Sequence, residues 1–261
     1  MTGHGDFETL RVAVDGRLGR LTLNRPERLN PLGVQTLREL AEAARWFDAR
    51  DEVRVVVVSG AGRAFSSGAD LSSFSGRPEL PAREAADLGR QMADALEGMR
   101  ALSIAAIRGW CVGGGLVLAA ACDLRVASEG TRFSIPEVDL GIPLAWGGIP
   151  RLVREIGPAL TKELVLSCRA FDAEEARAAG FLNRIVPEAS LDAEVEALAR
   201  ALAAKAGVAL FATKRHVNAV TSQMVGTARS WSDADGLVTA LQDPECAEAR
   251  QRYLAARRRR G

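Results

Sequence analysis

The segment from Ile107 to Val126 constrains the fold more than any other part of this chain. Its sequence, IRGWCVGGGLVLAAACDLRV, predicts a buried strand, a tight turn of three glycines, an apolar helix and a second strand. The glycines let the backbone turn and approach a ligand without interference from a Cβ atom. The helix that begins there has unpaired amides and the positive end of its dipole at the turn. Such a helix end can bind an anion, or an oxygen that becomes one during a reaction.

A second glycine-bearing loop, AFSSGADL at residues 64–71, also follows a predicted strand. It could direct another backbone amide toward the same oxygen. Two backbone donors beside an apolar pocket suggest enolate chemistry, in which a carbonyl oxygen gains negative charge.

Composition argues against several classes of function. The 261 residues are 48% hydrophobic and 26% charged, which is ordinary for a soluble globular protein. A net charge of +1 gives no overall field that would favour nucleic acid or a membrane surface. The first residues have neither the basic region nor the apolar run of a secretory signal, and no uncharged apolar stretch reaches the ~18 residues of a membrane span. We therefore expect a cytoplasmic protein with no membrane span and no nucleic-acid partner.

Cysteine and histidine usage argues against metal and triad chemistry. The four cysteines are widely spaced without a C-x-x-C pair, and the two histidines, His4 and His216, fall in a terminus and on a predicted helix surface. This pattern fits neither a zinc site nor a Ser-His-Asp relay, so we expect no bound metal.

Repeated strand-then-helix units predict an α/β core over residues 1–190, followed by a helical region over residues 191–261. Alternation around Asp15-Gly16 predicts a hairpin over 10–24, and the run VRVVVVS at 53–59 predicts a strand covered on both faces. Further strands are predicted at 103–107, 123–128, 131–135 and 181–187, and helices at 34–48, 83–99, 151–156, 159–167, 172–179 and from 188 onward.

These segments, in this order, resemble the crotonase superfamily, also called the enoyl-CoA hydratase/isomerase family. The resemblance rests on LNRPERLN at 23–30, FSSGAD at 65–70, the stretch 109–123, FSIPEVDLG at 133–141, and residues 173–186. It implies a crotonase-like spiral of repeated ββα units that binds an acyl-CoA thioester, with C-terminal helices that assemble homotrimers or homohexamers. It also implies an enzyme of fatty acid metabolism that needs no separate cofactor, because coenzyme A is part of the substrate.

Carried over by position, the resemblance implies that the N–H groups of Ala69 and Gly114 hold the thioester oxygen. Hydratases of the family use two glutamates, one on the helix after the triple glycine and one twenty residues later in a Pro-Glu pair. Here the second is Glu137, but Val117 stands at the position of the first. Family isomerases that move a 3-ene to a 2-ene have this arrangement, with one glutamate that carries the proton. An apolar pocket should raise the pKa of Glu137 toward neutrality.

Three interpretations therefore remain open. The favoured one is an enoyl-CoA isomerase that uses Glu137. The second is a hydratase, or another enzyme of the family, in which Asp139 or a residue of the 72–82 loop supplies the missing acid. The third is a non-catalytic protein that binds acyl-CoA.

The resemblance also implies the substrate contacts. Backbone around Ser67 to Asp70 would meet the adenine, Arg28 a phosphate, and Arg257 or Arg258 could add a cation from a neighbouring subunit. Leu144 and Trp146 would line the acyl pocket, whereas Trp110 is expected to pack behind the glycine turn. The full set of expected substrate contacts is Arg28, Ser67, Gly68, Asp70, Leu71, Gly113, Val117, Leu144 and Trp146.

Overall fold

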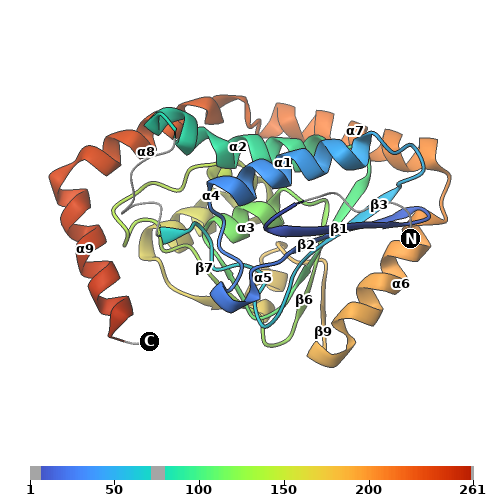
Figure 1. Cartoon of the computed structure of the whole chain (residues 1–261), viewed down its shortest axis with the longest axis horizontal. Coiled ribbons are helices and arrows are strands. Elements are labelled where there is room, and N and C mark those ends of the chain that lie inside the picture. Colours follow the sequence, from blue (N-terminus) through green and yellow to red (C-terminus); the bar gives the residue numbers. More distant parts are fainter. Residues whose placement is uncertain (1–6, 72–79, 260–261) are drawn as a thin grey trace.

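The computed structural model describes residues 7–71 and 80–259 of the chain (Figure 1). A six-stranded sheet forms its centre, in the order β1-β2-β3-β4-β6-β9. These strands are β1 (Leu10–Asp15), β2 (Leu18–Leu23), β3 (Val55–Gly60), β4 (Leu102–Ile107), β6 (Leu124–Ser128) and β9 (Arg184–Val186). β1 and β2 pair as an antiparallel hairpin, and every later neighbour is parallel.

A second sheet of three short strands carries much of the candidate site. Its order is β5-β7-β8, with bounds Trp110–Val112, Arg132–Ser134 and Phe171–Asp172. β5 pairs with β7 in parallel, and β7 pairs with β8 antiparallel.

Helices cover both faces of the larger sheet. The main core cluster joins one face to α1 (Val34–Asp48), α2 (Ala82–Gly98), α3 (Gly114–Ala120), α4 (Gly148–Ser167) and α5 (Ala173–Ala178). A second cluster joins the other face to α6 (Leu191–Ala203). The run of valines in β3 alternates between these two clusters, with Val56 and Val58 in the first and Val55 and Val57 in the second. This confirms the prediction of a strand covered on both faces.

The last three helices are α7 (Gly207–Met224), α8 (Asp233–Gln242) and α9 (Pro244–Arg258). Short 3-10 turns complete the chain: η1 (Pro26–Arg28), η3 (Glu188–Ser190) and η4 (Ala228–Ser232). In Figure 1, α8 and α9 lie at one end of the molecule and α6 at the other. A third core cluster holds α8 against α2 and the loop before α4. Within the described part of the chain, no helix combines the length and apolar character that crossing a membrane requires.

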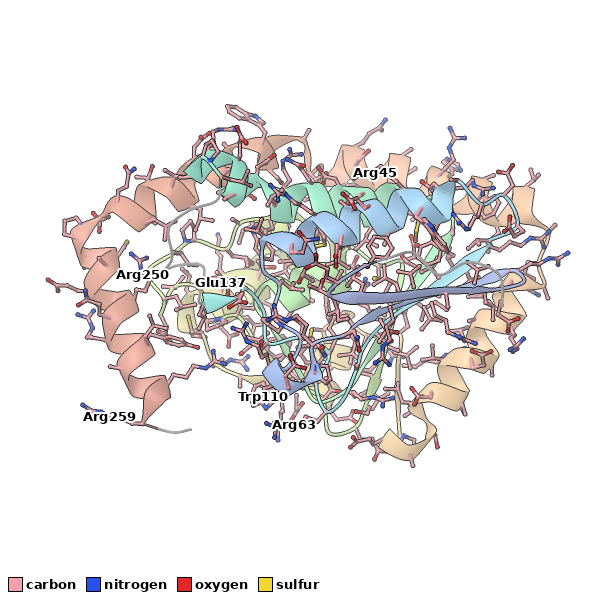
Figure 2. The ribbon with its side chains drawn as sticks, viewed as in Figure 1. Arg45, Arg63, Trp110, Glu137, Arg250 and Arg259 are labelled. Atoms are coloured by element: carbon pink, nitrogen blue, oxygen red, sulfur yellow. The ribbon has the colours of Figure 1, made fainter. Side chains whose placement is uncertain are left out.

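The mixed α/β architecture and the helical C-terminal region agree with the sequence prediction, and three local features differ. The helices predicted at 151–156 and 159–167 are joined in α4, which is broken at Gly157 (φ 75°, ψ 165°) before Pro158. β5 is separate from β4, whereas the sequence predicted one strand that leads into the glycine turn. Trp110 of β5 does not pack behind the glycine turn, because it is 44% exposed and lies at the lower edge of the molecule in Figure 2.

Candidate active site

The loop after β3 is shaped by the buried side chain of Asn30. Its Nδ2 donates to the carbonyl oxygens of Ala61, Ala64 and Phe65 at 2.9, 2.9 and 3.3 Å. The hydroxyl of Ser66 donates back to the Asn30 carbonyl at 2.8 Å, so the loop is tied to the segment that follows β2. Satisfied buried polar groups of this kind fix one loop conformation.

This loop presents the amide of Ala69. Ala69 forms a parallel bridge with Leu32, in which Leu32 N–H donates to the Gly68 carbonyl at 2.8 Å and Asp70 N–H donates to the Leu32 carbonyl at 3.1 Å. The bridge uses the carbonyl of Gly68 and the N–H of Asp70, so the N–H of Ala69 itself points away from Leu32. Among the described residues, that N–H has no hydrogen-bond acceptor.

The triple glycine presents a second amide. Gly113 caps α3 with φ 49° and ψ −114°, a conformation that favours glycine, and its N–H donates to Ser134 at 2.9 Å. Gly114 begins the helix, so its N–H has no intrahelical partner, and no other acceptor for it lies within residues 7–71 and 80–259. A Cβ added to Gly68 would lie 3.5 Å from the nitrogen of Gly114, which shows that the two loops meet.

Glu137 follows β7 and is buried, with 8% of its surface exposed. Its carboxylate lies against the glycine turn, because a Cβ on Gly113 would be 2.3 Å from Oε1. Oε2 is buried without a hydrogen-bond partner in the described part of the chain. Loss of solvation raises the pKa of Glu137 to about 7, in line with the expectation of an apolar pocket. Figure 2 shows Glu137 inside the fold.

These groups meet at a cavity of about 50 Å³. Its walls are otherwise apolar, and Glu137 is the one carboxylate among the described residues that line it. Val117 of α3 forms part of the wall and is buried. The lining residues are Ala69, Gly114, Val117, Glu137, Ile142, Pro143, Leu144, Ala145, Trp146 and Leu237.

The loop before α4 is held by a buried arginine. Arg151 is fully buried, and its Nη1 donates to the carbonyl oxygens of Trp146 and Gly147 at 3.4 and 3.2 Å. Its Nη2 donates to Asp94 at 2.9 Å and also to Glu97, both on α2. A buried guanidinium with paired carboxylates is costly to disrupt, so this cluster fixes the loop to α2.

Six expected site residues line the cavity: Ala69, Gly114, Val117, Glu137, Leu144 and Trp146. Gly68 and Gly113 lie directly behind them, whereas Ser67 and Leu71 are partly buried and are not part of the wall. Arg28 lies elsewhere, in an ion pair with Asp70 at 3.2 Å. Arg257 is exposed on α9, and the Arg258 side chain lies outside the described part.

The position of Asp139 argues against its acting as the missing second acid. The segment after Glu137 is a turn rather than an extended strand, with Leu140 N–H donating to the Pro136 carbonyl at 3.0 Å. Asp139 is therefore exposed and does not line the cavity. Residues 72–79 of the loop that was the other candidate lie outside the described residues.

Sequence analysis missed the contribution of α8. Leu237 of α8 lines the cavity, and Asp233 Oδ2 accepts a hydrogen bond from Gly147 N–H at 2.8 Å. No motif marks these residues, and about one hundred positions separate them from Glu137. Among the described residues, no group of three or more histidine, cysteine or acidic side chains could hold a metal ion.

Comparison with known proteins points to one family. The family model described as "Enoyl-CoA hydratase/isomerase" matches residues 15–260. A crotonyl-CoA hydratase from Syntrophomonas wolfei is 33% identical over 239 residues, which cover 91% of this chain and 92% of that protein. A peroxisomal Delta(3,5)-Delta(2,4)-dienoyl-CoA isomerase from Arabidopsis thaliana is 35% identical over 227 residues, covering 82% of each. Among solved structures, an enoyl-CoA hydratase from Mycobacterium avium subsp. paratuberculosis K-10 aligns with a TM-score of 0.86 at 27% identity, covering 95% of this chain and 99% of that one.

Proposed function

The chain belongs to the enoyl-CoA hydratase/isomerase family, and from that premise we propose that it isomerises a 3-enoyl-CoA to a 2-enoyl-CoA with Glu137 as its single acid–base group. The observation that carries this proposal is that Glu137 and Val117 line the same cavity. In the hydratases of the family, a second glutamate stands where this chain has the valine. Valine can neither activate water nor deliver a proton.

The two backbone amides supply the electrostatic part of the reaction. With the thioester oxygen between Ala69 N–H and Gly114 N–H, removal of a C2 proton would leave a dienolate whose negative charge rests on that oxygen. Both donors lack another acceptor among the described residues, so they need not break a bond to bind it. One such donor typically contributes about 3 kcal/mol of transition-state stabilisation.

Glu137 would move the proton. The ionised carboxylate takes the proton from C2, the double bond shifts from C3–C4 to C2–C3, and the resulting carboxylic acid returns the proton to C4. No atom is gained or lost. A pKa of about 7 suits both halves, because the group accepts and releases a proton with similar ease near neutral pH. The apolar walls would keep water away from the dienolate.

The ion pair of Arg28 supports a role in binding the coenzyme. Its side chain is 45% exposed, so it can meet a phosphate while Asp70 orients it. Arg25 approaches the other Asp70 oxygen at 3.8 Å and adds positive charge nearby. We propose that this cationic edge receives a phosphate of coenzyme A.

Hydration is the second candidate function. It is favoured by the names of relatives such as the crotonyl-CoA hydratase and a probable enoyl-CoA hydratase from Rhizobium meliloti, which is 38% identical over 214 residues. Hydration by this chain would require an acid from outside the described cavity wall, or a single carboxylate that serves both the water and the carbon.

Two absorbance assays distinguish the candidates. A 3-enoyl-CoA should gain the absorbance of a conjugated thioester, and a 2-enoyl-CoA should keep it. Loss of the conjugated signal from the 2-enoyl-CoA would identify a hydratase instead. If neither assay shows a change in absorbance and the protein still binds acyl-CoA, the protein is a binding protein rather than an enzyme.

Two substitutions, Glu137→Gln and Val117→Glu, test the roles proposed for these positions. Glu137→Gln should lower kcat for isomerisation at least a hundredfold, and unchanged turnover would refute the assignment of the base. Val117→Glu should add measurable hydration if the second carboxylate is all that is missing.

A further inference from the structure

We propose that Trp146 limits the length of the acyl chain, so that this cavity accepts short hydrocarbon acyl groups and excludes long ones. The inference rests on the proposed binding of an acyl-CoA thioester. It assigns substrate selection to one side chain and to two glycines that make room for it, Gly89 and Gly114.

The indole of Trp146 occupies a space left by these two glycines. A Cβ added to Gly89 of α2 would lie 1.9 Å from the indole Cδ2, and one added to Gly114 of α3 would lie 2.2 Å from Cζ3. Real Cβ atoms do not approach so closely, so neither position has room for a side chain while the indole is there. The ring therefore lies directly against the backbone of two helices.

Hydrogen bonds hold this tryptophan in place. Trp146 has φ 62°, a left-handed conformation that is unusual for a bulky residue and needs support from its surroundings. Arg151 donates to its carbonyl and to that of Gly147, and Gly147 N–H donates to Asp233. Arg151 is also paired with two carboxylates of α2. The loop that carries Trp146 is therefore attached to α2 through Arg151 and to α8 through Asp233.

The size of the cavity indicates what fits. One water-sized sphere needs about 10–15 Å³, so a cavity of about 50 Å³ has room for roughly four such groups. We infer that a four-carbon acyl chain fits this space and that a longer chain would meet the indole, which lines the cavity. The remaining walls beside Trp146 are apolar, among them Leu144 and Leu237, so hydrocarbon rather than polar chains are favoured.

Titration calorimetry with two saturated thioesters tests the inference without relying on turnover. Butyryl-CoA should bind the wild-type protein at least tenfold more tightly than octanoyl-CoA. Trp146→Ala should reduce that preference at least tenfold, whereas Trp110→Ala, which alters an exposed tryptophan outside the cavity, should preserve it. Equal binding of both thioesters by the wild type would overturn this inference and leave the proposed function standing. Failure of both to bind would overturn the proposed function, and this inference with it.

A matched pair of glycine substitutions in α2 tests the mechanism by a second route. Gly89→Ala should push the indole into the cavity and weaken butyryl-CoA at least tenfold. Gly98→Ala should change nothing, because a Cβ there meets no atom within 4 Å. Adding Trp146→Ala to Gly89→Ala should restore binding. A Gly89→Ala protein that binds like Gly98→Ala, or a double variant without rescue, would show that the indole does not set the limit.

Discussion

Under the proposed mechanism, the buried carboxyl of Glu137 should make the activity depend on pH near neutrality. A base must be ionised to act, and burial raises the pKa of Glu137 to about 7. We expect kcat/KM for a 3-enoyl-CoA to fall about tenfold per pH unit below that value, since a smaller fraction of the free protein then carries the carboxylate. Initial rates measured between pH 5 and 9 would show this decrease of kcat/KM on the acidic side. A profile that stays flat down to pH 5 would contradict a role for a carboxyl with a raised pKa.

The same group makes stability depend on pH. Its pKa is 4.5 without perturbation and about 7 in the folded protein, so between these values the folded state keeps a proton that the unfolded state releases. Stability should therefore fall as the pH rises from 4.5 to 7, and the full penalty, about 3 kcal/mol, should be present above 7. Glu137→Gln removes this penalty. Urea unfolding should show the variant to be more stable than wild type at pH 8, with a difference that shrinks toward pH 5; a constant difference would refute the linkage.

At the scale of elements, the start of α3 presents the Gly114 amide and lies against the Glu137 carboxylate. Gly113→Ala would place a Cβ 2.3 Å from Glu137 Oε1 on a residue with φ 49°. We expect at least a hundredfold loss of isomerisation, because the carboxylate and the Gly114 amide would both be displaced. Gly130→Ala is the control, since its nearest contact would be an ordinary 3.9 Å. Equal activities of the two variants would show that the glycine turn does not have to be this close to the acid.

The contact between α7 and the sheet depends on one buried lysine. Lys214 Nζ lies 2.8 Å from Asp123 Oδ2 and donates to the Ala101 carbonyl at 2.9 Å. Lys214→Met would leave the aspartate without its cation, and we expect a loss of about 3 kcal/mol in unfolding free energy. Lys205→Met, at an exposed position, should be nearly neutral. Denaturant titration of both variants measures the difference, and equal midpoints would contradict this account of how α7 is anchored.

At the scale of the whole molecule, the resemblance leads us to expect trimers or hexamers. α7 presents Val217, Val220 and Met224 with 57, 49 and 76% of their surface exposed. Their spacing of three and four residues places them on one side of the helix, where contact with another copy would bury them. Light scattering should give three or six times the mass of one chain. A monomer at micromolar concentration would refute the expectation.

Local pattern was enough to predict most of the strands and helices of the fold. The alternation in β1 and β2, the valine run of β3 and the periodicity of α1 each follow from which faces are buried. The glycine turns mark two loops in the sequence, but Ala69, Gly114 and Glu137 were named only through the resemblance to the family. β5 left no such mark, because three residues between glycines are too few to show a period.

The conformation of Trp146 and the contribution of α8 to the cavity wall could not be predicted, for a different reason. A left-handed backbone conformation is rare for tryptophan, and no sequence signal predicts it at Trp146. The conformation depends on hydrogen bonds from Arg151 and on the space at Gly89. The contribution of Leu237 arises from packing between segments far apart in the chain, and a single sequence does not specify which distant helices will touch. Asp139 was considered as a second acid on the assumption of an extended segment, and the turn after Glu137 removes that basis.

The place of α8 in the cavity wall has a consequence for shortened forms of the protein. The sheet, the glycine turn and Glu137 all precede residue 190, whereas Leu237 and the Asp233 contact to Gly147 belong to α8. A chain cut before α8 would therefore keep the proposed acid and both amide donors but lose part of the pocket wall. We expect such a shortened chain to be inactive.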